Sequence, residues 1–262
     1  MRKMVSMLLV LTMAFSLTAC GKKTEETREL TVFAASSMTE TLTKISELYK
    51  EENPEVTLVF NFDSSGTLKT QIQEGADCDL FISAGQKQMD ELNILEDTRI
   101  NILENKVTLC VSETSEAGIE NFDDLAAALK EGKVLLAMGN SDVPVGQYTQ
   151  KILIYYGLRE EELAKAGTIS YGSNVKEVTT QVSEGSADCG VIYCTDAFSA
   201  GLTVKDAANV EMCGQVIYPA AVLKASKQQE EAKAFLEFLQ TDVCTEIFEG
   251  VGFSKVNEGR VE

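Results

Sequence analysis

The fold of this chain is indicated first by residues 30–39, LTVFAASSMT. Residues 30–35 form a run of apolar and β-branched side chains, and two serines follow it. The next segment, 39–52, places Leu42 and Ile45 on one face at helical spacing. The first pattern predicts a buried strand and the second an amphipathic helix. Serines between them are typical of the turn where a helix begins.

The same alternation of strand and helix continues along the chain. Further strands are predicted at residues 56–62, 80–83, 107–111, 134–138, 168–171, 189–193 and 216–223. Helical spacing also marks residues 174–184, 228–239 and 241–249. Such alternation predicts an α/β fold with mainly parallel sheets.

The length of the chain permits two lobes of ordinary size. Residues 106–111 and 216–223 are candidates for strands that cross between the lobes, and the last two predicted helices then return to the first lobe. We therefore assign residues 29–106 plus 218–262 to lobe 1 and residues 107–217 to lobe 2.

The N-terminus has the order of regions expected of a secretion signal. Arg2 and Lys3 precede an apolar run, residues 4–15, that is too short to span a bilayer as a helix. Residues 17–20, LTAC, resemble the bacterial lipobox, which implies removal of residues 1–19 and acylation of Cys20. The protein would then be exported and lipid-anchored to the outer face of the cytoplasmic membrane, with residues 20–28 as a polar tether. An ordinary signal with a coincidental cysteine is the alternative.

Charge and composition argue against several functions. The net charge is −18, and losing Arg2 and Lys3 with the signal leaves 21 basic against 41 acidic residues, a net charge of −20. Nucleic acid is therefore an unfavourable partner. The chain has no histidine, which removes Ser-His-Asp, Cys-His and histidine-based metal sites. We predict that the protein is not an enzyme and needs no cofactor; a hydrolase or transferase using a serine is the disfavoured alternative.

The cysteines do not form a recognisable framework. Six besides Cys20 occur at irregular spacings, which favours buried thiols over disulfides while leaving both open. They are Cys78, Cys110, Cys189, Cys194, Cys213 and Cys244.

Three predicted strands end in small or hydroxyl-bearing turns that open into helices, at residues 36–39, 63–67 and 139–146. In an open α/β sheet these strand ends border the ligand crevice, and helix N-termini bind anions there. Ser37 and Ser65 could instead be ordinary N-caps, and Tyr193 an ordinary core residue. The combination of several donors at several strand ends predicts an anion site.

Several segments resemble the periplasmic molybdate-binding proteins of ABC transporters, in order and over nearly the whole chain from about residue 29 to Phe253. They are VFAASSMT (32–39), FDSSGTL (62–68), GADCDLFISA (75–84), VPVGQY (143–148) and GVIYCTDA (190–197). The resemblance implies a two-lobed, type II periplasmic-binding architecture, with a mostly parallel sheet in each lobe, that closes on its ligand by hinge motion. It also implies an ABC permease and its ATPase as partners, and a protein that acts as a monomer.

The resemblance also implies which residues hold the oxyanion. Ser37 and Ser65 match the family's two serine donors, and Tyr193 matches the tyrosine that completes the shell. Val145 and Val175 fall at positions that give backbone N–H groups. The family usually has alanine where this chain has Val145.

Five positions without a lysine or arginine suit molybdate or tungstate. Both ions are fully deprotonated at neutral pH and need only donors, whereas hydrogen phosphate also needs an acceptor for its proton. Asp63, beside the serine turn, is a departure that would bring such an acceptor if it faced the ligand. Sulfate or another tetrahedral oxyanion stays open as the ligand. So does a ligand-free adhesin or sensor lipoprotein of the same fold.

Overall fold

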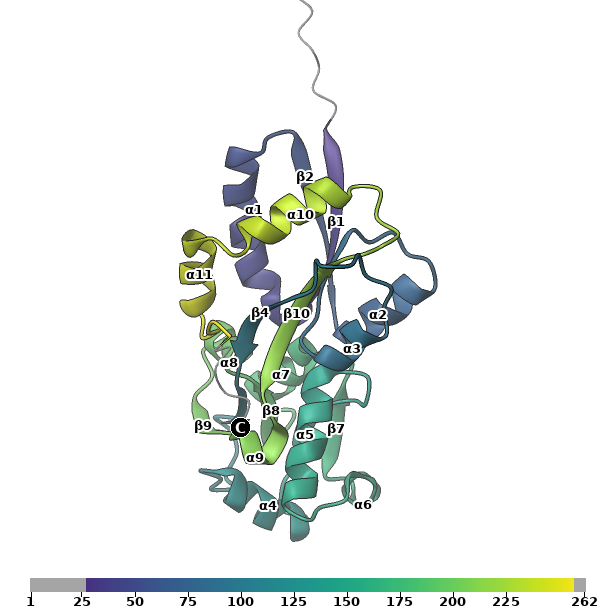
Figure 1. The fold of residues 1–262 in the computed structure, drawn as a ribbon. Helices are drawn as coiled ribbons and strands as arrows, with labels where there is room; N and C mark the ends of the chain where they lie inside the picture. The colour runs from purple at the N-terminus through teal and green to yellow at the C-terminus, as the bar shows by residue number, and fades with distance from the viewer. Residues whose placement is uncertain (1–26, 257–262) are drawn as a thin grey trace, which may run out of the picture.

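The chain forms two lobes, each built around a five-stranded sheet (Figure 1). The structure is a computed structural model and describes residues 27–256. The signal at 1–19, Cys20 and most of the tether lie outside the described residues. Arg28, assigned above to the tether, is the first residue of the first strand.

The sheet of lobe 1 has the strand order β2-β1-β3-β10-β4. Its strands are β1 (Arg28–Ala35), β2 (Val56–Asp63), β3 (Leu80–Ile82), β4 (Ile100–Asn105) and β10 (Val216–Val222). β1 pairs in parallel with β2 and β3, whereas β10 runs antiparallel to β3 and β4. The central strands are almost continuously buried because helices cover the sheet.

Helices from both ends of the chain complete lobe 1. They are the 3-10 turn η1 (Ser36–Met38) and the helices α1 (Thr39–Glu52), α2 (Ser65–Gln73), α3 (Gln86–Asp90), α10 (Gln229–Phe238) and α11 (Asp242–Glu249). α1 and α10 meet through Tyr49, whose ring lies 4.9 Å from that of Phe235 and 5.0 Å from that of Phe238. In the structure the C-terminal helices therefore pack on the first lobe.

The sheet of lobe 2 has the strand order β7-β6-β8-β5-β9. Its strands are β5 (Val107–Val111), β6 (Leu136–Gly139), β7 (Ile169–Gly172), β8 (Cys189–Tyr193) and β9 (Val204–Ala207). Its helices are α4 (Phe122–Lys130), α5 (Pro144–Tyr155), α6 (Glu160–Ala166), α7 (Val175–Ser183), α8 (Cys194–Ala200) and α9 (Val210–Cys213). β6 is parallel to β7 and β8, while β5 is antiparallel to β8 and β9.

The lobes are joined at two places. Lys106 alone separates β4 of the first sheet from β5 of the second, and the return passes through α9 into β10. β10 pairs only with strands of lobe 1, so the return crossing lies before residue 216 and not within the predicted strand 216–223.

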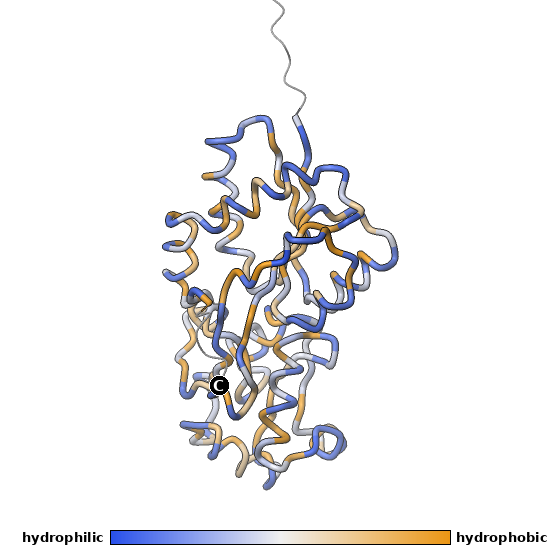
Figure 2. Tube along the Cα trace, in the orientation of Figure 1, coloured by the Kyte–Doolittle hydropathy of each residue, from blue (hydrophilic) through white to orange (hydrophobic). Residues whose placement is uncertain are grey.

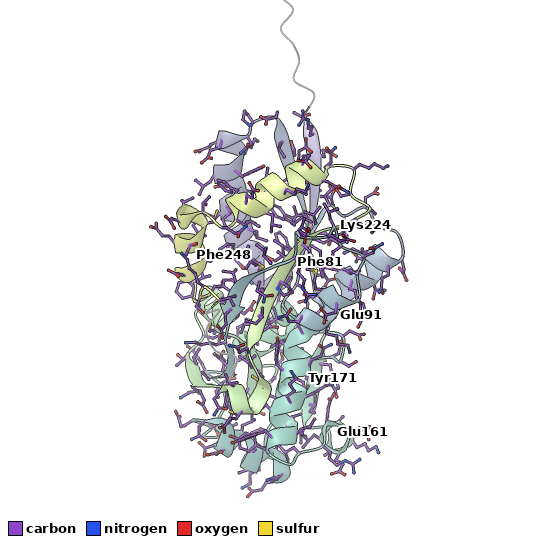
Figure 3. The ribbon with its side chains drawn as sticks, viewed as in Figure 1. Phe81, Glu91, Glu161, Tyr171, Lys224 and Phe248 are labelled. Atoms are coloured by element: carbon purple, nitrogen blue, oxygen red, sulfur yellow. The ribbon has the colours of Figure 1, made fainter. Side chains whose placement is uncertain are left out.

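The apolar residues lie inside both lobes. Figure 2 shows hydrophobic segments along the strands and hydrophilic ones on the outer helices and loops. In Figure 3, Phe81 lies within lobe 1, where it is fully buried, and Tyr171 lies at the periphery of lobe 2, where it is 43% exposed. Each lobe thus has the layered, buried sheet that an α/β architecture requires.

The α/β class and the two-lobed architecture are confirmed, and the sheets differ from the prediction in one respect. Both are mixed, because β10 in lobe 1 and β5 in lobe 2 run against their parallel neighbours. Each of these two strands follows a connection between the lobes, and each runs antiparallel to its neighbours in the sheet.

Two further properties concern the described residues 27–256. No helix among them is both long and apolar enough to cross a membrane. Their six cysteines are free thiols, five of them buried and Cys194 partly exposed.

Candidate functional site

A small cavity lies where the strand ends of the two lobes face each other. Its free volume is about 10 Å3, close to the roughly 10–15 Å3 that one water molecule needs and far below the roughly 300–1,000 Å3 of sites for drug-sized ligands. Lobe 1 lines it with Ala35, Ser36, Ser37, Asp63, Ser64, Ser65 and Ala84, and lobe 2 with Val143, Pro144, Val175 and Tyr193. The cavity suits a small, compact solute.

Ser37 enters the cavity from the turn after β1. It belongs to η1 and is 5% exposed. Its hydroxyl lies 2.9 Å from the phenol oxygen of Tyr218 and makes no helix-capping bond. The N-cap interpretation of Ser37 is therefore wrong.

The two serines after β2 have different roles. Ser64 is the N-cap of α2, since its hydroxyl oxygen accepts a hydrogen bond from the backbone N–H of Thr67 at 3.1 Å. The hydroxyl oxygen of Ser65, which is fully buried, accepts from the backbone N–H of Ala84 at 2.9 Å. The hydroxyl hydrogen of Ser65 is thereby left to donate elsewhere. The N-cap interpretation is also wrong for Ser65.

Lobe 2 presents the starts of two helices. α7 begins at Val175, and its N-cap Asn174 accepts from the N–H of Glu177 at 3.1 Å, which leaves the first N–H of the helix without a capping partner. α5 begins at Pro144, which has no N–H, so Val145 carries the first N–H of that helix. Val145 is fully buried but its side chain does not line the cavity.

Tyr193 closes the cavity from the end of β8. Its hydroxyl is buried and has no hydrogen-bond partner among residues 27–256. Burial raises the pKa of this phenol well above its ordinary value, so it stays protonated. The rings of Tyr148 and Tyr218 hold it, at centroid distances of 6.5 Å and 5.8 Å. A buried hydroxyl without a partner costs about 1–3 kcal/mol and indicates a donor kept for a ligand.

The charged groups around the cavity have partners, which are neutral N–H groups for Asp63 and charged side chains for Lys176. Asp63 lines the cavity, and its Oδ1 accepts from the N–H of Ser64 at 2.7 Å and from Nδ2 of Asn174 at 3.2 Å. Lys176, beside Val175, lies 2.8 Å from Glu40 and 3.3 Å from Asp196. Burial raises the pKa of Asp196 to about 6, against the opposing effect of Lys176. No lysine or arginine lines the cavity.

The same contacts hold the lobes together around the cavity. The bonds of Asn174 to Asp63 and of Lys176 to Glu40 both join lobe 2 to lobe 1. At Gly66, a Cβ atom would lie 2.0 Å from the backbone oxygen of Asp142 in the other lobe. The lobes therefore meet with no room to spare at this point.

Four of the five predicted site residues line one cavity: Ser37, Ser65, Val175 and Tyr193. The fifth, Val145, lies one residue beyond the lining. Sequence reasoning missed Tyr218 and Asn105, which lie behind Ser37 and are linked by a 3.1 Å hydrogen bond. No local pattern marks them, because they are 113 residues apart in the chain.

The donors in this cavity are neutral hydroxyl and N–H groups, and the whole sequence has no histidine to form a nucleophile–base pair with a serine. These donors can hold an anion that carries no proton, because each of them gives it a hydrogen bond, whereas the carboxylate of Asp63, which also lines the cavity, can only accept. Fold and cavity together define the class of two-lobed proteins that enclose a small solute between their lobes.

Similarity to known proteins identifies the family to which the chain belongs. The family described as "Bacterial extracellular solute-binding protein" matches residues 30–254. "Molybdate-binding protein ModA" of Haemophilus influenzae is 30% identical over 96% of this chain and 97% of its own. The Bacillus subtilis protein named "Putative ABC transporter substrate-binding lipoprotein YvgL" is 32% identical over 86% of each chain.

A solved structure is also similar to this chain. It is the "substrate binding domain of putative molybdenum ABC transporter from Clostridium difficile", with 35% identity, a TM-score of 0.65, and coverage of 87% of this chain and 99% of that one. The chain belongs to the bacterial extracellular solute-binding protein family and, within it, to the ModA family of periplasmic binding proteins.

Proposed function

We propose that the protein captures molybdate, and tungstate equally, in the cavity between its lobes and delivers it to an ABC importer. The observation that carries this proposal is the buried hydroxyl of Tyr193, which has no hydrogen-bond partner within residues 27–256 and belongs to a residue lining the same cavity as Ser37 and Ser65. The names of the ModA relatives support molybdate as the ligand. In this proposal Ser37, Ser65 and Tyr193 donate their hydroxyl hydrogens, and Val145 and Val175 their backbone N–H groups.

Neutral donors are sufficient for tight binding. Each hydrogen bond to a charged group contributes about 1.5–3 kcal/mol, and a helix start adds roughly 0.3–2 kcal/mol. Micromolar affinity needs about 8 kcal/mol after the ordering costs. Five donors reach this value without a lysine or arginine, which is consistent with the lining of the cavity.

The remaining parts of the proposal concern transport. The protein acts as a monomer, binds without catalysing a reaction, and passes its ligand to a permease driven by an ATPase. Acylated Cys20 anchors it to the outer face of the cytoplasmic membrane, and the lipoprotein name of the Bacillus subtilis relative supports this anchoring. Mass spectrometry of the membrane-extracted protein tests the anchor directly, since the proposal requires a diacylglyceryl-modified N-terminal Cys20.

The ligand is tested by thermal unfolding of the mature protein with molybdate, tungstate, sulfate or phosphate at equal concentration. A ligand bound only by the native state at 100 times its Kd adds about 2.7 kcal/mol, or roughly 5–10 °C in Tm for a chain of this size. We expect such a rise with molybdate and tungstate and none with phosphate. A larger rise with sulfate would assign the protein to sulfate, and no rise with any oxyanion would favour an adhesin or sensor.

A further inference from the structure

A chain of buried hydrogen bonds leads to Ser37 from behind the cavity. Nδ2 of Asn105 donates to the phenol oxygen of Tyr218 at 3.1 Å, and that oxygen lies 2.9 Å from the hydroxyl of Ser37. The three residues are 3%, 0% and 5% exposed, respectively. Asn105 and Tyr218 lie at the connections between the lobes, at the end of β4 and within β10.

The orientation of the Asn105 amide is fixed by its other partners. Its Oδ1 accepts from the backbone N–H of Lys106 at 2.8 Å and from the thiol of Cys194 at 3.1 Å. An N–H can only donate, so the oxygen of the amide must face Lys106. The amide nitrogen then has one hydrogen for Tyr218 and one for the hydroxyl of Thr195, 3.0 Å away in lobe 2.

This orientation sets the direction of the whole chain of bonds. The phenol oxygen of Tyr218 accepts from Asn105, and Ser37 is the other partner within hydrogen-bond distance among the described residues, so we assign the phenol hydrogen to the oxygen of Ser37. Burial raises the pKa of Tyr218 well above its ordinary value, so that hydrogen is always present. Ser37 accepts from Tyr218, and its single hydroxyl hydrogen is directed into the cavity that it lines.

We infer that Tyr218, oriented by Asn105, is a positioning residue that makes Ser37 an obligate donor and so disfavours oxyanions that carry a proton. The inference rests on the proposed function and adds a mechanism of selectivity to it. Molybdate, tungstate and sulfate accept at every oxygen. Hydrogen phosphate and hydrogen arsenate also carry an O–H group. Where that group faces Ser37, the hydroxyl hydrogen of Ser37 meets another hydrogen instead of an oxygen lone pair. Without the phenol of Tyr218, the hydroxyl of Ser37 can rotate and accept.

Isothermal titration of the mature protein with molybdate and with hydrogen arsenate tests the inference. Tyr218→Phe removes one oxygen and leaves the ring that packs on Tyr193 and Phe253. We expect molybdate affinity to fall about tenfold, because the hydroxyl of Ser37, which is an aligned donor to a charged ligand, becomes free to rotate. We also expect the preference for molybdate over arsenate to fall by a larger factor. Tyr49→Phe is the matched control, since Tyr49 is a buried tyrosine of lobe 1 that packs on Phe235 and Phe238 and does not line the cavity.

A double-mutant cycle separates positioning from a general loss of packing. If Tyr218 acts through Ser37, then Tyr218→Phe changes molybdate affinity little in a Ser37→Ala background, because the hydroxyl that it orients is gone. Additive effects of the two substitutions would overturn the inference, as would unchanged affinity and selectivity in Tyr218→Phe alone.

Asn105→Asp tests the same chain from its other end with an isosteric side chain. The substitution puts an acceptor where the amide of Asn105 donates, so the phenol hydrogen of Tyr218 turns toward position 105. The hydroxyl of Ser37 then donates to the phenol oxygen of Tyr218 instead of to the ligand. We expect weaker molybdate binding and a smaller preference over arsenate than in the wild type. A preference equal to that of the wild type would contradict the inference. If the wild-type protein binds no oxyanion, the proposed function fails and this inference with it; binding by the wild type with unchanged variants refutes the inference alone.

Discussion

At the scale of single residues, neighbouring side chains of the same type have separate roles. Ser64 caps α2, while Ser65, one residue later, keeps its hydroxyl hydrogen for the cavity. The sequence alone offers Ser65 as a possible N-cap, because it follows a predicted strand and precedes a helix. The N-cap geometry decides between them, since only Ser64 has the extended backbone of a capping residue, with φ −62° and ψ 142°.

Tyr193 gives the clearest prediction for a single residue. Tyr193→Phe should weaken molybdate binding by about 1.5–3 kcal/mol, because it removes one donor to a charged ligand. The same substitution removes a buried hydroxyl that has no partner in the described part of the chain. The Tm of the protein without added ligand should therefore stay equal or rise. Titration calorimetry and thermal unfolding of both proteins measure these effects. Unchanged affinity would place the ligand elsewhere.

The sequence predicted the residues that touch the cavity better than those behind it. Ser37 and Ser65 lie in turns after strands, which local patterns indicate, whereas Val175 and Tyr193 are assigned by the family resemblance. Tyr218 and Asn105 meet only through the tertiary fold, so no spacing in the chain indicates their bond.

At the scale of elements, the missed strands share a physical reason. β4, INILEN, mixes apolar and polar residues at the edge of its sheet, and only two of its six residues are buried. β9, VKDA, is a short edge strand with no buried residue. Neither β4 nor β9 has the continuous apolar run that identifies central strands such as β8, all five residues of which are buried.

The approach of α2 to lobe 2 gives a prediction at this scale. Gly66→Ala places a Cβ atom 2.0 Å from the backbone oxygen of Asp142, so the lobes cannot meet as they do here. We expect molybdate affinity to fall at least about tenfold, which is about 1.4 kcal/mol. Stability without ligand should hold, since alanine favours a helix over glycine by roughly 0.5–1 kcal/mol.

Gly250→Ala is the matched control for Gly66→Ala. Gly250 lies at the end of α11 and has a helical backbone, with φ −59°. It does not line the cavity. Its substitution should leave the affinity unchanged. Wild-type affinity in Gly66→Ala would mean that the ligand does not require this contact between the lobes.

At the scale of the whole molecule, a protein with a net charge of −18 is proposed to bind a dianion. The charged groups nearest the cavity are engaged by neighbours: Lys176 lies between Glu40 and Asp196, and the carboxylate of Asp63 accepts from the neutral N–H groups of Ser64 and Asn174. Oriented neutral dipoles act at contact distance, whereas exposed charges farther away than about 8–10 Å are screened by salt. The local donors therefore outweigh the distant acidic surface.

The most direct test of this account is a crystal structure of the mature protein grown with sodium molybdate, with data collected to locate the metal by anomalous scattering. We expect one strong peak between the lobes, with molybdate oxygens at hydrogen-bond distance from the hydroxyls of Ser37, Ser65 and Tyr193. A peak on the outer surface only, or those three hydroxyls turned away from the bound ion, would contradict the account.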